Sequence, residues 1–225
     1  MILALLLACS AEPAAVAPVS KPVPALSPAA ASADALVPEG WTVVQQLSGD
    51  LDGDNIADEV ALLSRTVGDE LQATLRLRMK GVVREAPNAV CAQCGGVKGT
   101  PVPFELELDE ARHVLSISYF GGSREVRMRT TKWRRQGDTL ALIGLVEHFY
   151  DSFPEGVGAL AGNTAEANYS TGQMDWKVET VSGPPAKADE MPPTSETVVR
   201  CAIPAGPRPD LFSYDHGSFE APRCP

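Results

Sequence analysis

The segment Gly49–Asp58 carries side chains whose types and spacing could bind a metal ion. Its sequence is GDLDGDNIAD, and its carboxylates stand at loop positions one, three, five and nine: Asp50, Asp52, Asp54 and Asp58. Calcium in proteins takes about six to eight oxygen ligands at roughly 2.3–2.6 Å, which closely spaced aspartates can supply. Without a cation these carboxylates repel one another, even in water. The sequence therefore predicts a calcium ion in this loop.

A simpler interpretation of the same loop is an acidic, solvated turn. Aspartate side chains often accept hydrogen bonds from backbone amides a little further along the chain, with no metal involved. The loop is also not an EF-hand, because Ala61 stands at the twelfth position, where an EF-hand has a bidentate glutamate. Heat of binding and a thermal shift on adding calcium would separate the two interpretations.

The spacing of the loop resembles the D-x-D/N-G-D-G-x-x-D loops of FG-GAP and integrin-type β-propeller repeats, which lie between strands and bind calcium. That resemblance implies that four aspartate side chains and the carbonyl of Ile56 are the ligands. Asn55 replaces the usual glycine, and asparagine tolerates left-handed backbone better than most residues. The chain contains one copy of the loop, whereas a propeller needs several, so the resemblance covers the loop alone.

The opening residues MILALLLACS resemble a bacterial lipobox, with a small residue directly before Cys9. The resemblance implies that residues 1–9 are a lipoprotein signal segment and that the acylated Cys9 anchors the protein in a lipid bilayer. The protein is then expected in the cell envelope, facing the periplasm or the surface, and Ser10 after the lipid cysteine favours the outer membrane. A basic n-region is missing, which a start codon further upstream would explain. An ordinary buried N-terminal segment is the alternative.

Residues 10–38 are nearly all Ala, Pro, Val and Ser, a composition typical of a disordered linker. At about 3.1 Å per residue in a polyproline conformation, such a tether could reach about 80 Å. It would hold the following domain away from the membrane.

Four further cysteines favour disulfide bonds in an oxidising compartment. Cys91 and Cys94 are close enough in sequence for a small local ring, and a bond between Cys201 and Cys224 would fix the C-terminal tail. A redox-active Cys91/Cys94 pair is one alternative. A structural zinc site is another, although it needs two more ligands, for which His113 and the two distant cysteines are the candidates.

Alternating apolar and polar residues predict an all-β domain over residues 39–181. The clearest strand is Leu71–Lys80, with one apolar and one wet face. Further strands are expected at Thr42–Leu47, Asp58–Ser64, Phe104–Asp109, Leu115–Tyr119, Arg124–Arg134, Thr139–Val146 and Met174–Val178. About eight strands joined by short turns indicate a mainly antiparallel sandwich or a barrel-like sheet with long loops. Asp151–Asn168 is expected to be a loop, and residues 182–225 a Pro-rich tail. The core is expected to contain Trp41, Leu75, Leu77, Phe104, Leu106, Leu115, Ile117, Leu142, Ile143 and Trp176.

Several motifs, in order, resemble a family of uncharacterised exported proteins and lipoproteins of Gram-negative bacteria. After the acidic loop these are CxxCGGVxGxP at Cys91–Pro101, YFGGS at Tyr119–Ser123, then LIG, DSF and NYxTG. The resemblance spans about Gly49–Val178 and implies no activity. Relatives carry aromatic residues where this chain has a basic strand.

Charge and motif content favour a non-catalytic binding or structural module stabilised by calcium. A net charge of −10 argues against nucleic acid. Against this acidic background, Arg124, Arg127, Arg129 and Arg134 could contact an anionic envelope polymer or an envelope protein, or simply pair with Glu105, Glu107 and Asp109 across the sheet. The alternative function is an envelope enzyme, either a thiol-disulfide oxidoreductase or a calcium-assisted hydrolase using Asp58 and Glu59. His113, His148 and His216 lie in unrelated contexts and form no catalytic set.

Overall fold

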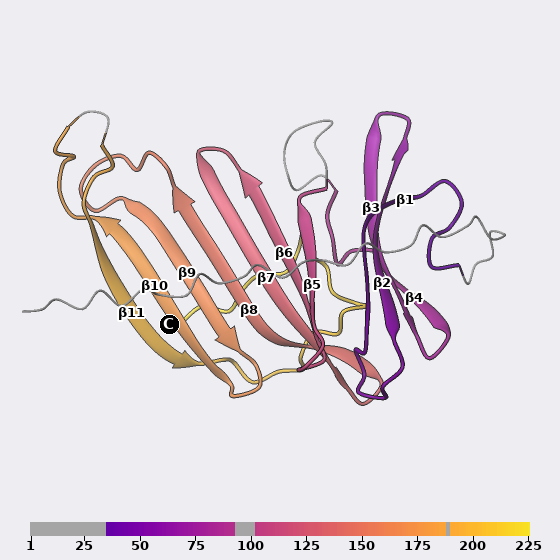
Figure 1. Cartoon of the computed structure of the whole chain (residues 1–225). Coiled ribbons are helices and arrows are strands. Elements are labelled where there is room, and N and C mark those ends of the chain that lie inside the picture. Colours follow the sequence, from indigo (N-terminus) through magenta and orange to yellow (C-terminus); the bar gives the residue numbers. More distant parts are fainter. Residues whose placement is uncertain (1–34, 93–101, 188–189) are drawn as a thin grey trace, which may run out of the picture. The chain divides into compact units, whose positions relative to one another are not determined.

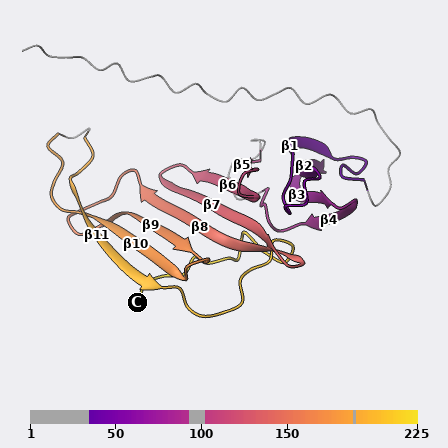
Figure 2. The same cartoon turned by 60° about the horizontal axis from the view of Figure 1, so that its bottom comes forward.

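The computed structural model describes residues 35–92, 102–187 and 190–225, which form eleven β-strands and no helix. Every strand pairs antiparallel with its neighbours, in two open sheets that are seen separately in Figures 1 and 2. The prediction of an all-β, antiparallel fold is confirmed. Within these ranges there is no helix of the length and hydropathy needed to cross a bilayer.

The first sheet has four strands in the order β1-β2-β3-β4. They are β1 (Thr42–Gly49), β2 (Asp58–Val67), β3 (Glu70–Met79) and β4 (Val82–Ala86). As predicted, Leu75 and Leu77 of β3 are fully buried. The opposite face of β3 is not wet, however, because Arg76 there is 9% exposed.

A short segment before β1 covers that second face. Nη1 of Arg76 donates to the carbonyl of Ala35 at 2.6 Å. Leu36 packs with Ala61 and Leu63 of β2 in a small second core. The packed part of the chain therefore includes Leu36, which lies inside the range expected to be linker.

The second sheet has seven strands in the order β11-β10-β9-β8-β7-β6-β5. They are β5 (Phe104–Asp109), β6 (Val114–Gly122), β7 (Glu125–Gln136), β8 (Thr139–Asp151), β9 (Leu160–Asn168), β10 (Gln173–Val181) and β11 (Thr194–Ala202). All eight predicted strands are present; β5 has the predicted ends, and the other seven have one or both ends shifted. The sequence did not predict β4, β9 or β11, and the loop expected over Asp151–Asn168 is wrong because β9 occupies its second half.

One hydrophobic core contains side chains of both sheets. Of the residues predicted for it, seven are buried: Leu75, Leu77, Phe104, Leu106, Leu115, Ile117 and Leu142. Trp41, Ile143 and Trp176 are only half-buried. The register between β7 and β8 shifts at Trp133, which leaves Ile143 without a partner on β7. Trp133 itself is fully buried, although the sequence did not single it out.

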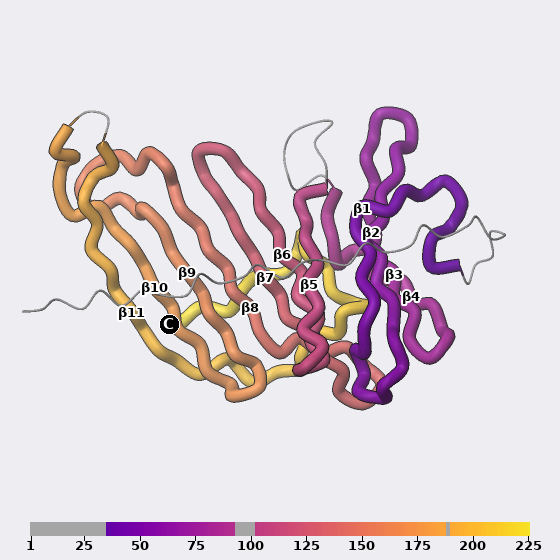
Figure 3. The backbone as a smooth tube through the Cα atoms, in the orientation of Figure 1, coloured from indigo at the N-terminus to yellow at the C-terminus, as the bar shows by residue number. Residues whose placement is uncertain are grey.

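The C-terminal tail is part of the fold rather than an appendage. Figure 3 shows it, in yellow, returning from β11 across strands of the second sheet. The amide of Leu142 donates to the carbonyl of Pro209, and the amide of Leu211 donates to the carbonyl of Leu140, both at 2.9 Å. Leu211 and Tyr214 are buried in the shared core. Residues 182–225 thus supply one strand and part of the core.

The side chain of Gln45 joins the two sheets where β1 lies beside β5. Its Nε2 donates to the carbonyl of Leu106 at 2.6 Å, and its Oε1 accepts from the amide of Leu106 at 2.7 Å. The side-chain amide therefore satisfies both backbone polar groups of a residue that is 3% exposed. The Gln45 side chain thus makes the two hydrogen bonds to Leu106 that a residue of a neighbouring strand would make.

Gln45→Ala should destabilise the protein by about 1–3 kcal/mol, because it leaves two buried backbone groups without partners. Gln46→Ala is the matched control, since the Gln46 side-chain amide donates a long hydrogen bond of 3.4 Å to Glu59 and contacts no buried backbone group among the described residues. Its cost should stay within about 0.5 kcal/mol. Urea denaturation midpoints would measure both. Equal midpoints for the two variants would rule out this role of Gln45.

Candidate metal centre

The acidic loop connects β1 to β2, and the carboxylate of Asp50 organises its backbone. Oδ1 accepts from the amide of Gly53 at 2.7 Å and from those of Asp52 and Asp54 at 3.2 Å, while Oδ2 accepts from the amide of Asn55 at 2.9 Å. Gly53 and Asn55 have φ values of 79° and 64°, as the left-handed turn requires. Partial burial acts to raise the pKa of Asp50, but the amide hydrogen bonds outweigh it and hold that pKa below its usual value.

Asp58 ends the loop and begins β2. It is 3% exposed, and its Oδ2 accepts from the amide of Leu51 at 2.9 Å. Leu51 is fully buried in the shared core, so this bond ties the loop to the core. Burial raises the pKa of Asp58; the Leu51 amide opposes this, and the neighbouring Asp52, Asp54 and Asp50 carboxylates add to it. Asp58 is therefore a buried carboxylate that lies close to three other negative charges.

Asp52 lies between these two aspartates in sequence, and its side chain is 0% exposed. Its Oδ2 forms an ion pair with Arg135 of β7 and lies 3.4 Å from Nζ of Lys80. Its Oδ1 is buried and accepts no hydrogen bond from any residue that the structure describes. A buried carboxylate oxygen without a partner is costly, so it needs a ligand to offset it.

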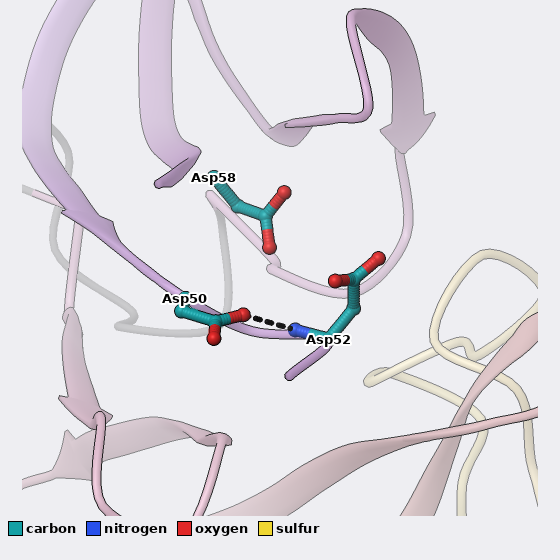
Figure 4. A group of neighbouring side chains, drawn as sticks. All are labelled: Asp50, Asp52 and Asp58. Carbon is teal, nitrogen blue, oxygen red and sulfur yellow. Dashed lines mark hydrogen bonds between the residues drawn. The ribbon is translucent and has the colours of Figure 1, made fainter. Parts of the chain in front are cut away.

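The fold brings three of the five predicted ligands together. Asp50, Asp52 and Asp58 each offer an oxygen, and these atoms lie within 4.8 Å of one another (Figure 4). Asp54 is not in this group, and its Oδ1 accepts from the amide of Ile56 at 2.8 Å. The fifth predicted ligand is the backbone carbonyl of Ile56, and it stays a prediction.

Three basic residues distant in sequence flank the loop, and the sequence did not predict their place. His113, in the turn between β5 and β6, has Nδ1 2.8 Å from the carbonyl oxygen of Asp50. Lys80 lies in the turn after β3, with Nζ 3.6 Å from Oδ2 of Asp54. Arg135 comes from the second sheet. These contacts depend on how the sheets come together, which no local pattern encodes.

The two predicted disulfide bonds have different outcomes. Cys201 and Cys224 form a disulfide with Cα atoms 5.7 Å apart, which confirms that prediction. Their thiols are consumed, so the zinc alternative that used them is wrong. Cys91 is disulfide-bonded, whereas Cys94 and the predicted lipid site Cys9 lie outside the described residues. Both the local ring and the lipidation stay predictions.

The arginines on β7, together with Arg124 just before it, do not form the ion pairs that the sequence suggested. β6 lies between β5 and β7, and within the described residues none of these arginines forms an ion pair with Glu105, Glu107 or Asp109. Arg124 instead contacts Asp151 at 3.1 Å. The Arg127 guanidinium lies 5.4 Å from the centre of the Phe149 ring.

Arg129 is the most enclosed member of the set, with its side chain 13% exposed. It pairs with Glu147 at 2.6 Å and donates to the carbonyls of His216 and Phe219 at 2.9 and 3.0 Å. It therefore fastens the tail to the sheet. Arg127 and Arg134 are exposed and remain the candidates for an anionic partner.

No protein-family model, curated protein or solved structure matches this chain. The fold and the loop define the class of protein: an all-β chain of two antiparallel sheets with a preorganised acidic loop where the sheets meet. The grouped aspartates of that loop are the candidate functional feature of the chain.

Proposed function

We propose that the acidic loop binds one calcium ion, and that the ion stabilises a non-catalytic binding or structural module of the cell envelope, tethered through acylated Cys9. The observation that carries the proposal is the fully buried Asp52 side chain. One of its oxygens has no hydrogen-bond partner within the described part of the chain, and two more carboxylates lie beside it. A divalent cation would satisfy that oxygen and hold the three carboxylates together.

The charge balance of the loop supports a divalent ion. Four aspartates lie in the loop, and two fixed cations, Arg135 and Lys80, approach them. Two negative charges are left over when His113 is neutral. Burial of the Asp52 and Asp58 side chains makes this excess costly, because repulsion between charges grows as solvent is excluded.

The position of the loop explains what the ion would do for the fold. The loop is tied to the core through Leu51 and to β7 of the second sheet through Arg135. Fixing the loop would therefore fix the junction of the two sheets. This is a stabilising role and needs no bound substrate.

The disulfides support an extracytoplasmic location. The bond between Cys201 and Cys224, together with a disulfide-bonded Cys91, is typical of proteins that mature in an oxidising compartment. Together with the lipobox-like opening, this favours the periplasmic or outer surface of a membrane. Calcium is available there.

Isothermal titration of the chelator-treated chain tests the calcium proposal. We expect one site per chain, and at calcium about a hundredfold above the dissociation constant a stabilisation of about 2.7 kcal/mol. For a chain of this size that is a rise in melting temperature of about 5–10 °C. Absence of both heat and thermal shift at millimolar calcium would leave the solvated-turn interpretation standing.

A further inference from the structure

β11 ends the second sheet, and its outer edge is open among the described residues (Figure 1). It is a nine-residue strand without proline, and every residue from Thr194 to Arg200 is exposed. Proteins usually protect such an edge with proline, bulges or a covering segment, because its unpaired backbone groups pair readily with another strand. β11 contains no proline and no bulge, and its charged side chains are Glu196 and Arg200.

The hydrogen bonds at both ends of β11 fix which of its backbone groups face outward. The amide of Ile203 donates to the carbonyl of Gly172 at 2.9 Å, and the amide of Ser182 donates to the carbonyl of Pro193 at 2.8 Å. The pairing between β10 and β11 is regular from end to end. Bonding alternates along an antiparallel strand, so odd-numbered residues bond to β10 and even-numbered residues face the open edge. The outward groups belong to Thr194, Glu196, Val198, Arg200 and Ala202.

The side chains of these even-numbered residues carry an unbalanced charge pattern. Arg200 lies opposite Asp175 and contacts it at 2.6 Å, but its side chain is still 73% exposed. Glu196 lies directly opposite Glu179, and among the described residues neither glutamate has an ion-pair partner. Like charges directly opposite each other destabilise a strand pair.

We infer that β11 pairs antiparallel with β11 of a second copy, about a two-fold axis at Val198. In this register Glu196 faces Arg200 of the partner subunit, and the reverse pair forms by symmetry. Every outward backbone group of the strand gains a partner, and each Glu196 gains the cation that it lacks in one chain. A slip of two residues keeps the same faces but loses both ion pairs, so charge selects this register. The inference is independent of the calcium site.

Sedimentation of the full chain over a dilution series tests the pairing. We expect a reversible species of about twice the 23.8 kDa chain mass. Glu196→Lys puts a cation opposite the partner's Arg200 at two symmetric positions, and it should raise the dimer dissociation constant about tenfold or more. Glu179→Lys is the matched control: it makes the same charge change and removes the same repulsion within one chain, but it does not alter the edge. It should leave the dimer in place.

A second variant tests the backbone pairing itself. Val198→Pro removes an amide that faces outward, so the bonds to β10 survive, as proline is tolerated on that side of an edge strand. It should yield a folded monomer that still unfolds cooperatively, with a melting temperature that no longer depends on protein concentration. A wild-type chain that is monomeric throughout would overturn the inference. A dimer that Val198→Pro and Glu196→Lys leave unchanged would overturn it as well.

Discussion

Asp58→Asn should abolish the calcium-induced rise in melting temperature while leaving the calcium-free protein at least as stable as wild type. The asparagine keeps an oxygen to accept the Leu51 amide, but it removes a buried charge that lies among other carboxylates. Loss of that repulsion is worth about 1 kcal/mol, or about 2–4 °C for a chain of this size. Compared with wild type, Asp58→Asn should thus be less stable with calcium and at least as stable without it. A residue needed only for folding would lower stability under both conditions.

Asp138→Asn is the matched control for this experiment. Asp138 is exposed in the turn between β7 and β8 and is not one of the grouped carboxylates. The variant removes one negative charge and should keep the full calcium response. If Asp58→Asn also keeps that response, Asp58 is not a ligand.

The stability of the calcium-free protein should depend on pH because of the charge on Asp58. Because the pKa of Asp58 is raised above 3.8 in the folded state, the fold binds this proton more tightly than the unfolded chain does. The stability from this proton is present below pH 3.8 and is lost as the pH rises through the raised pKa. With chelator present, the stability of wild type should therefore drop relative to that of Asp58→Asn as the pH rises from 3.8 through the raised pKa. At higher pH the difference in stability between the two proteins should stay constant. Thermal melts of both proteins at several pH values would measure this gap.

Arg129→Met should be among the most destabilising single substitutions in the protein, at about 3–5 kcal/mol. The change leaves the Glu147 carboxylate, which is 22% exposed, without its cation. It also leaves the tail carbonyls of His216 and Phe219 without their donor. The tail should then detach, which limited proteolysis would detect together with a lower urea midpoint.

Arg127→Met provides the control on the same strand and the same face. Its guanidinium is exposed over the Phe149 ring, a contact worth about 0.5–1 kcal/mol. Similar losses of stability in the two variants would show that Arg129 does not fasten the tail.

The parts of the fold that follow from local pattern could be predicted from the sequence. Phe104–Asp109 matches β5 because its apolar residues alternate strictly and are large. β9 was missed because its inward residues Ala161, Ala165 and Ala167 are small and give little contrast with their neighbours. Trp133 was overlooked because it stands among arginines, although alternation along β7 puts it in the core.

The candidate metal site likewise has parts that the local sequence predicts and parts that depend on long-range packing. Asp50, Asp52 and Asp58 are close in sequence, and loop spacing alone indicated that they would meet. The partner of Asp52 could not be predicted, because Arg135 is 83 residues away and reaches it only when the two sheets come together. The covered face of β3 depends similarly on a distant segment at Leu36. Long-range packing thus decides which charges the loop has to balance.

Native mass spectrometry of the intact chain, dialysed against a calcium buffer, counts the calcium ions that each chain retains. We expect one calcium ion per chain for wild type and for Asp138→Asn, and none for Asp58→Asn. A wild-type chain that retains no calcium, or an Asp58→Asn chain that retains as much as wild type, would contradict the proposed calcium site.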